Sequence, residues 1–179
     1  DIKYHDEEWG KPEFNDEKLF EIFILETMQA GLSWSTILRK RENMRKAFDK
    51  FDYKIIAQYD DEKKKSLLED EGIIRNRLKI DALISNAKAF MKIQEEYGSF
   101  SKYIWKFTED KPIVNKWESI SQVPAKTEIS DKMSKELKKK GFKFAGSTIC
   151  YAFMQATGMV NDHMIWCDEY KKSLKAKKS

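Results

Sequence analysis

Apolar residues recur along most of the chain at helical spacing, and the sequence predicts helices with no convincing strand. The first helix follows Asn15, a good N-cap, and two acidic residues suit its first turn. Its residues are apolar on most sides, which is typical of a helix central to a fold. Glu26 nevertheless shares one stripe of this helix with Leu19, Ile22 and Phe23. A buried acid is costly without a partner, so Glu26 is either a bonded core residue or part of a pocket for a polar or cationic ring.

Further helices are predicted by the same periodicity and by capping residues. Ser33 is a cap for one helix, and either Asp60 or Asp61 is a cap for the next. A long amphipathic stretch follows, and its apolar residues include Leu78 and Leu83. The predicted helices span residues 34–51, 61–72, 75–97 and 101–107. The segment 108–127 contains two prolines and is irregular, so it is the best candidate for a connection between two lobes.

The most specific local pattern is a helix, a glycine-bounded turn and a second helix. Ser130 is predicted to cap the first helix and Gly141 to end it, and the second helix begins at Ser147 and ends near Gly158. Free N–H groups at the start of the second helix, surrounded by lysines, favour an anion. The turn is therefore a candidate for binding a nucleic-acid phosphate without reading bases. An ordinary helical hairpin with a glycine C-cap is the alternative.

Composition and charge narrow the class of protein. The chain has 179 residues, 41% of them hydrophobic, with 3 Pro and 7 Gly, which suits an all-α fold of one domain or two small lobes. The net charge is only +4, but basic residues cluster at 39–41, 138–143 and 171–178. Such clusters suit a polyanion, although Lys-rich helix faces are more often simply solvated. No apolar run approaches membrane-spanning length and no signal peptide is visible, so no membrane partner is expected.

The histidines and cysteines are few. His163 and Cys167 lie one helical turn apart, and the remaining histidine is His5. A His–Cys pair at this spacing is half of a tetrahedral zinc site, but three scattered candidates alone do not favour zinc. The second cysteine, Cys150, has apolar neighbours and is expected in the core. Two cysteines cannot form a disulfide framework, which indicates a reducing cytosol.

Five segments together resemble the 3-methyladenine DNA glycosylase I family: YHDEEWG, LETMQAGLSW, GIIRNR, LKKKGFKFAG and GMVNDH. Their order and spacing agree from Tyr4 to Cys167. The family is a divergent branch of the helix-hairpin-helix DNA glycosylases, which are all-α, with an active-site cleft between two helical lobes. The resemblance implies a single glycosylase domain over residues 1–167, with the helix-hairpin-helix at 130–157. The basic tail, 168–179, lies outside the resemblance and is expected to be disordered.

The resemblance also implies site residues. Those expected to bind the base are Glu26, Tyr4, Trp9 and Trp34, of which Glu26 is also the candidate catalytic group. Those expected to contact DNA are Gly31 and Leu32, in an intercalating loop, and Gly141, Phe142, Lys143, Gly146 and Ser147, in the hairpin. The implied ligands of a structural zinc are His5, His163 and Cys167. The family's fourth ligand is a cysteine that would precede Asp1. Because the chain opens without an initiator Met, we expect an excerpt of a longer protein and leave zinc occupancy open.

The implied activity is excision of 3-methyladenine from alkylated double-stranded DNA by base flipping and hydrolysis, without lyase activity. Most helix-hairpin-helix glycosylases carry a catalytic Asp after the hairpin, where this chain has Asn161, and Asp162 is expected to point elsewhere. An adenine methylated at N3 is cationic, so it leaves with less acid–base help. The expected product is free 3-methyladenine, and the expected enzyme is a bacterial, cytoplasmic monomer. A catalytically silent DNA-binding module and a glycosylase for a different alkylpurine are the alternatives.

Overall fold

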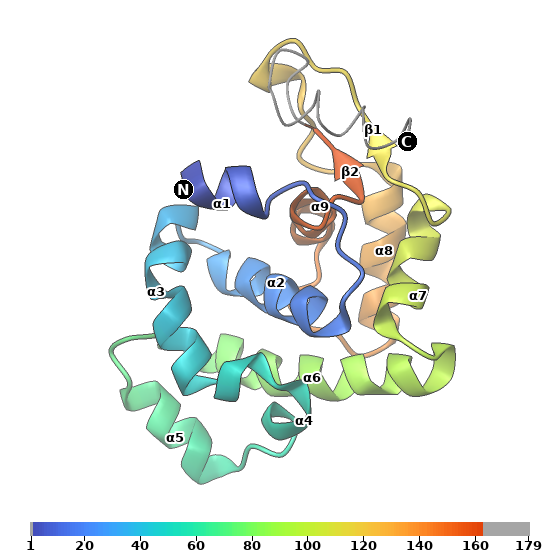
Figure 1. Cartoon of the computed structure of the whole chain (residues 1–179). Coiled ribbons are helices and arrows are strands. Elements are labelled where there is room, and N and C mark those ends of the chain that lie inside the picture. Colours follow the sequence, from blue (N-terminus) through green and yellow to red (C-terminus); the bar gives the residue numbers. More distant parts are fainter. Residues whose placement is uncertain (1, 163–179) are drawn as a thin grey trace.

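The computed structural model describes residues 2–162, apart from the side chains of residues 2, 5, 6 and 120, and this part is mostly helical (Figure 1). The predicted tail at 168–179 lies outside the described residues. The α-helices are α1 Ile2–Glu7, α2 Asp16–Gln29, α3 Trp34–Ala47, α4 Tyr53–Ile56, α5 Asp61–Glu69, α6 Arg77–Tyr97, α7 Phe100–Trp105, α8 Glu128–Lys139 and α9 Ser147–Ala156. Short 3-10 turns span Asp49–Phe51, Lys106–Thr108 and Ile120–Gln122. The prediction of an all-α fold is confirmed. No helix among the described residues has the length and apolarity needed to cross a membrane.

Helix α2 lies at the centre of the molecule and packs against α3, α6, α7 and α9 (Figure 1). It begins where the sequence predicts, because the side chain of Asn15 accepts a hydrogen bond from the Lys18 N–H at 3.0 Å. Aromatic side chains join it to its neighbours. The Phe20 ring contacts Phe90 of α6 at 5.2 Å between centroids, and the Phe23 ring contacts Phe153 of α9 at 5.5 Å. The residues flanking Glu26 are therefore fixed from several sides.

The N-caps of α3 and α5 are Ser33 and Asp60, as the sequence predicts, but the N-cap of α8 differs from the prediction. The sequence predicts Ser130 as the N-cap, whereas the structure has Thr127 in that position and Ser130 at the third helical residue. The two residues form a reciprocal capping box, with Thr127 N donating to Ser130 Oγ at 2.8 Å and Ser130 N to Thr127 Oγ1 at 3.3 Å. The helix-hairpin-helix therefore covers 128–156 rather than 130–157.

The first turn of α6 also departs from the prediction. Leu78, expected on the apolar face, is 69% exposed, whereas Lys79 is only 5% exposed. The Lys79 ammonium donates to the carbonyl oxygens of Met28, at 2.7 Å, and Ala30, at 2.6 Å. Burial lowers the pKa of Lys79, but carbonyls at the C-terminal end of α2 present the negative end of its dipole. A buried cation on α6 thus caps the central helix.

The prediction that no strand is present is wrong, because the structure contains two short strands among its described residues. Strand β1, Ile113–Val114, pairs in parallel with β2, Val160–Asn161. These residues lie in the irregular segment after α7 and directly after α9. Two-residue strands have too little periodicity to be read from a sequence. Their pairing attaches the segment between α7 and α8 to the end of α9.

Candidate active site

A pocket of about 320 Å³ opens beside α2, and α1, α3 and α9 also contribute to it. Its lining residues are Tyr4, Trp9, Glu26, Gln29, Trp34, Ala152 and Gln155. The four residues that the sequence proposes for base binding therefore come together, although three different helices and a turn carry them. The lining residues on α9 were not anticipated. These residues are Ala152 and Gln155, which lie one turn apart on α9. The sequence indicates this helix only as part of the hairpin.

Glu26 has the environment of a functional acid. Its side chain is 4% exposed, and none of the residues that the structure describes donates a hydrogen bond to its carboxyl group. Burial raises its pKa from an ordinary value of 4.5 to about 8. A desolvated acid without a protein partner, at the wall of a pocket, is a candidate for contact with a ligand. The alternative of a core Glu bonded to an Arg does not hold within this part of the chain.

The aromatic wall of the pocket consists of Tyr4 and Trp34, with Trp9 beside them. The rings of Tyr4 and Trp34 lie 5.4 Å apart between centroids and are tilted by 52°. Burial, and secondarily the charge of Glu26, raises the pKa of the Tyr4 hydroxyl above its usual value. The hydroxyl therefore keeps its proton and can act as a donor. The backbone N–H of Trp9 donates to the backbone carbonyl of Tyr4 at 3.0 Å, which fixes the turn that carries Trp9.

The turn after α2 presents the two residues proposed to enter DNA. Gly31 has a φ of 82°, a conformation that favours glycine, and Leu32 is 39% exposed. The backbone N–H of Leu32 donates to the Gln29 carbonyl at 2.6 Å. The Lys79 ammonium binds the carbonyls of the residues before and after Gln29, which are Met28 and Ala30. An exposed apolar side chain on a braced turn, next to a pocket, suits a wedge that fills the gap left by a flipped base.

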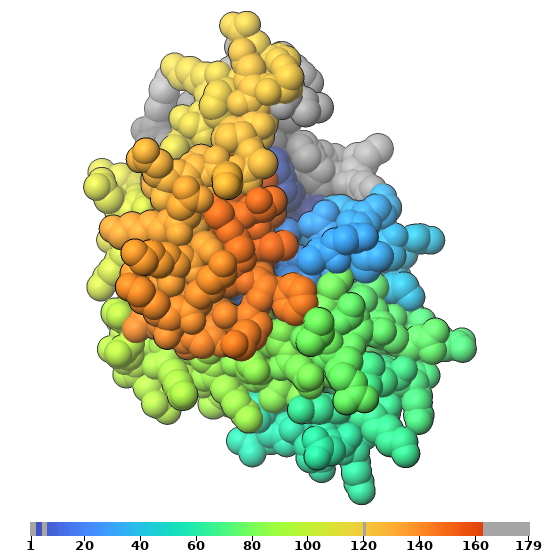
Figure 2. All heavy atoms as spheres, turned by 180° about the vertical axis from the view of Figure 1, so that it is seen from behind, coloured from blue at the N-terminus to red at the C-terminus, as the bar shows by residue number. Residues whose placement is uncertain are grey.

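The hairpin between α8 and α9 is held from inside the protein. Asn86 of α6 is fully buried, and its amide both accepts from the Lys143 N–H at 2.7 Å and donates to the Lys143 carbonyl at 3.1 Å. The Ser134 hydroxyl donates to the Ala145 carbonyl at 2.6 Å. Figure 2 shows this hairpin region (orange) and the start of α3 (blue) on one face of the molecule. The hairpin and the turn before α3, which are the two proposed DNA contacts, therefore lie on the same face of the molecule.

Individual hairpin residues differ from the prediction. Phe142 is 2% exposed and packs edge-on against Phe23 at 5.4 Å, so its side chain anchors the hairpin in the core and is not available to DNA. Gly141 has a φ of 96° and requires glycine, whereas Gly146 has an ordinary φ of −67° with open space around it. The Ser147 hydroxyl donates to Asp131 at 2.5 Å, which leaves its backbone as the candidate contact.

Asp162 does not face the pocket as a catalytic acid would. It is 3% exposed, and its carboxylate accepts hydrogen bonds from four side chains: Asn115 at 2.6 Å, Trp117 at 2.7 Å, Gln155 at 3.1 Å and Tyr151. These bonds tie the segment after β1 to α9. Asp162 therefore has a structural role. This agrees with its place in the sequence, one residue after Asn161, which holds the position of the catalytic Asp in related glycosylases.

The metal prediction falls largely outside what the structure describes. His163 and Cys167 lie beyond residue 162, and the side chain of His5 is not described. Within the described residues, no cluster of three or more His, Cys, Asp or Glu side chains could hold a metal ion. Cys150 is fully buried, as expected, and burial raises the pKa of its thiol to about 12.

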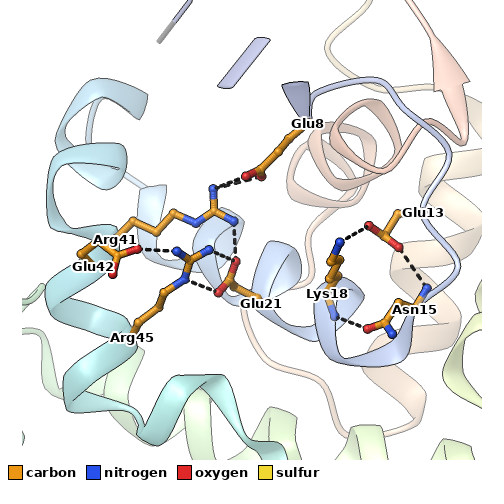
Figure 3. Close-up of polar contacts among 8 residues, drawn as sticks. All are labelled: Glu8, Glu13, Asn15, Lys18, Glu21, Arg41, Glu42 and Arg45. Carbon is orange, nitrogen blue, oxygen red and sulfur yellow. Dashed lines mark hydrogen bonds and ion pairs between the residues drawn. The ribbon is translucent and has the colours of Figure 1, made fainter. Parts of the chain in front are cut away.

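An ion-pair network beside the pocket was missed by sequence reasoning (Figure 3). Arg41 of α3 bonds to Glu8, at 3.0 and 3.2 Å, and to Glu21 of α2. Arg45, one turn later, binds Glu21 at 2.9 and 3.1 Å and also contacts Glu42. The sequence shows the basic run 39–41 only as a cluster of charge, and the partners lie in other helices. Arg41 is therefore paired within the protein.

Comparisons with known proteins agree over nearly the whole chain. The methyladenine glycosylase family model matches residues 1–170. DNA-3-methyladenine glycosylase 1 of Escherichia coli (strain K12) is 49% identical over 166 residues, 93% of this chain and 89% of that protein. DNA-3-methyladenine glycosylase of Haemophilus influenzae (strain ATCC 51907 / DSM 11121 / KW20 / Rd) is 50% identical over 166 residues, 93% of this chain and 90% of that protein. A solved structure on 3-methyladenine recognition by the Staphylococcus aureus 3-methyladenine DNA glycosylase I superposes with a TM-score of 0.92 at 34% identity, covering 94% of this chain and 90% of that one.

Proposed function

The chain belongs to the methyladenine glycosylase family, and we propose that it is a DNA repair enzyme that excises 3-methyladenine from alkylated double-stranded DNA. The observation that carries the proposal is Glu26, a buried acid with no hydrogen-bond donor among the described residues, in a pocket walled by Tyr4 and Trp34. Such a pocket suits a flat cationic ring with a hydrogen-bond donor on its edge.

The chemistry of the substrate explains why so little acid–base machinery is needed. Methylation at N3 gives the base a positive charge while the glycosidic bond is intact. When the bond between N9 and C1′ breaks, its electron pair moves to the base, which leaves as neutral 3-methyladenine. Water adds to C1′ and loses one proton, which yields an abasic sugar and no lyase product. The task of the protein is therefore to expose and recognise the base.

In this proposal each pocket residue has a role set by its environment. Burial keeps Glu26 largely protonated in the empty pocket, but a cationic base beside it favours the ionised carboxylate. The carboxylate then accepts a hydrogen bond from the exocyclic amine and offsets the positive charge of the base. Tyr4, Trp9 and Trp34 bind the ring by stacking and by cation–π attraction. Leu32 fills the space in the stack from which the base was flipped. The bracing of the turn by Lys79 supports this role, because a wedge must be rigid.

Binding to undamaged duplex is assigned to the hairpin. The backbone from Gly141 to Ser147 is proposed to bind a phosphate, supported by the N-terminus of α9 and by Lys143. A contact of this kind is independent of sequence, so it holds the enzyme on DNA without selecting the damaged base. We also propose that the protein acts as a monomer in the bacterial cytoplasm, which size-exclusion chromatography with and without duplex DNA and cell fractionation would test.

Replacement of Glu26 tests the proposed function. Glu26→Gln keeps the shape and removes the charge, so release of 3-methyladenine from methylated duplex should fall by roughly 100-fold. The measurement is the rate of free-base release under single-turnover conditions. Glu17→Gln is a matched control, because it neutralises an exposed acid on the same helix and should leave the rate unchanged.

The outcomes separate the alternatives. A folded wild-type protein that binds duplex DNA but releases no base would be a silent DNA-binding module. Release of another alkylpurine in preference to 3-methyladenine would indicate a different substrate. Wild-type excision by folded Glu26→Gln would show that Glu26 has no part in the reaction.

A structural zinc is a further part of the proposal. His5, His163 and Cys167 would bind one ion, together with a fourth ligand outside the described residues. Zinc supplies no step of the reaction here, and it would order the segment that carries Tyr4 and Trp9. Metal analysis of purified protein should give about one zinc per chain, and much less in Cys167→Ala, because closed structural sites need all their ligands. Full stability and activity without zinc would contradict this assignment.

A further inference from the structure

The pocket depends on a helix that is too short to hold its own position. Helix α1 has six residues, well below the length at which an isolated helix persists in water. It nevertheless carries Tyr4, whose ring forms one wall of the pocket against Trp34. The position of that wall must therefore be set by contacts between the α1 segment and the rest of the molecule.

Arg41 makes several contacts of this kind. One end of its guanidinium binds both carboxylate oxygens of Glu8, which follows α1 directly, at 3.0 and 3.2 Å. The other end bonds to Glu21 on the central helix (Figure 3). The guanidinium carbon also lies 5.9 Å from the centre of the Tyr4 ring, within cation–π range. One side chain of α3 thus touches α2, the end of α1 and the aromatic wall.

The strengths of these contacts differ. The side chains of Arg41 and Glu21 are only 12% and 14% exposed, so solvent screens their pairing little. Burial alone would raise the pKa of Glu21, but hydrogen bonds from Arg45 and Arg41 outweigh it and hold the pKa below its usual value. Glu8 is 44% exposed, and an ion pair of that exposure contributes little by itself. The pairing with Glu21 therefore holds the Arg41 guanidinium in place. The guanidinium in turn positions Glu8 and the ring of Tyr4.

We propose that Arg41 is a positioning residue for the base pocket, which fixes Tyr4 against Trp34 and the bound base without touching the base itself. Arg41 is not among the residues that line the pocket. The guanidinium suits this role, because its rigid planar fork presents separate N–H groups to two carboxylates in a fixed geometry, whereas a lysine offers a point charge on a flexible stem. The inference rests on the proposed function, since it concerns the same site.

Arg45 offers a matched control. It lies one turn further along α3, binds the same Glu21 and also pairs with Glu42, but no contact with Glu8 or Tyr4 is present among the described residues. Arg45→Met therefore removes ion pairs from the network and costs stability without releasing α1. Arg41→Met removes ion pairs from the same network and releases α1 as well.

The experiment compares wild type, Arg41→Met, Glu8→Gln, Arg45→Met and the Glu8→Gln/Arg41→Met double variant. The dissociation constant for free 3-methyladenine is measured by tryptophan fluorescence, together with kcat and KM for excision, affinity for undamaged duplex, and zinc content. Arg41→Met should raise the dissociation constant about tenfold, which corresponds to about 1.4 kcal/mol, and should lower kcat. KM for DNA and undamaged-duplex affinity should stay near wild type, since neither depends on the Tyr4 wall. Zinc content is compared because His5, a proposed ligand, lies on the same helix as Tyr4.

The other variants sharpen the result. Glu8→Gln should have a smaller effect in the same direction, and it should add nothing in the double variant, because both changes break one contact. Arg45→Met should bind the free base like wild type. If Arg41→Met does not fold, Glu8→Gln remains informative, since it alters an exposed partner. An unchanged dissociation constant in both, or an equal loss in Arg45→Met, would overturn the proposal. A wild-type protein that neither binds nor excises 3-methyladenine would instead overturn the proposed function.

Discussion

At the scale of single residues, position on a helix predicts the burial of Glu26 but not that of Lys79, and it does not predict what a buried charge meets. Glu26 and Lys79 are both charged residues in apolar surroundings. Lys79 is satisfied by two backbone carbonyls of α2, whereas no described residue hydrogen-bonds to Glu26. The sequence singles out Glu26 because its neighbours on the stripe are all apolar. It does not single out Lys79, because the carbonyls that Lys79 binds belong to a different helix, and local periodicity carries no information about such partners.

The burial of Glu26 predicts a dependence of stability on pH. Its pKa is about 8 in the folded protein and should return to about 4.5 on unfolding. Below pH 4.5 the carboxyl group is protonated in both states and costs nothing. Between pH 4.5 and 8 the unfolded state releases the proton first, so Glu26 destabilises the fold increasingly as pH rises. Glu26→Gln should therefore raise the free energy of unfolding at pH 8.5, by up to about 5 kcal/mol, and have little effect near pH 4.5.

The measurement is urea denaturation of wild type and Glu26→Gln at both pH values. Glu17→Gln serves again as the control and should show no such difference, because its side chain is exposed. Equal stability of wild type and Glu26→Gln at pH 8.5 would mean that Glu26 is solvated or paired in solution. The same variant is expected to be more stable and less active, which is the usual relation for a functional group held in a desolvated site.

At the scale of elements, the hairpin shows what a local pattern can and cannot define. The glycine-bounded turn, its flanking helices and the positive φ of Gly141 follow from the sequence. The true N-cap Thr127 was missed because Ser130 has the same chemistry three residues later, and both side chains take part in the capping box. The burial of Phe142 was missed because only the packed neighbours of a turn decide which way its aromatic side chain points. Bracing by Asn86 comes from 57 residues away.

A charge placed in the hairpin should weaken binding to all DNA. Gly146 has an ordinary backbone conformation and open space around it, so Gly146→Asp should fold normally. Its negative charge would repel the phosphate proposed to bind at the start of α9, and affinity should fall about tenfold for damaged and undamaged duplexes alike. Fluorescence anisotropy at fixed salt measures both. Gly146→Ala is the control and should bind like wild type, whereas a loss restricted to damaged DNA would indicate that the hairpin belongs to the base pocket.

At the scale of the whole molecule, the segment that follows Trp9 contacts the end of α9 beside the pocket, and no local pattern predicts this. The Gly10 N–H donates to the Ala156 carbonyl at 3.3 Å, and the Glu13 N–H donates to the Thr157 carbonyl at 2.9 Å. The segment after Trp9 thus runs directly over the end of α9. The all-α class and four of the seven described residues that line the pocket were predictable from helical spacing and family resemblance. The crossing of distant segments was not, because it depends on backbone contacts that any sequence could make.

This crossing leads to a prediction about Gly158. Its φ is 75°, and a Cβ atom there would lie 2.4 Å from the Pro12 nitrogen and 2.5 Å from the Lys11 carbonyl carbon. Both atoms belong to the backbone, so neither can move away like a flexible side chain. Gly158→Ala should therefore destabilise the protein by at least about 2 kcal/mol, from the strained φ and the clash together. Thermal unfolding measures the loss, with Gly146→Ala as a control that adds the same methyl group in open space. If the two variants unfold alike, the segments are not in contact in solution, and the N-terminal segment carrying Tyr4 and Trp9 must be held by other means.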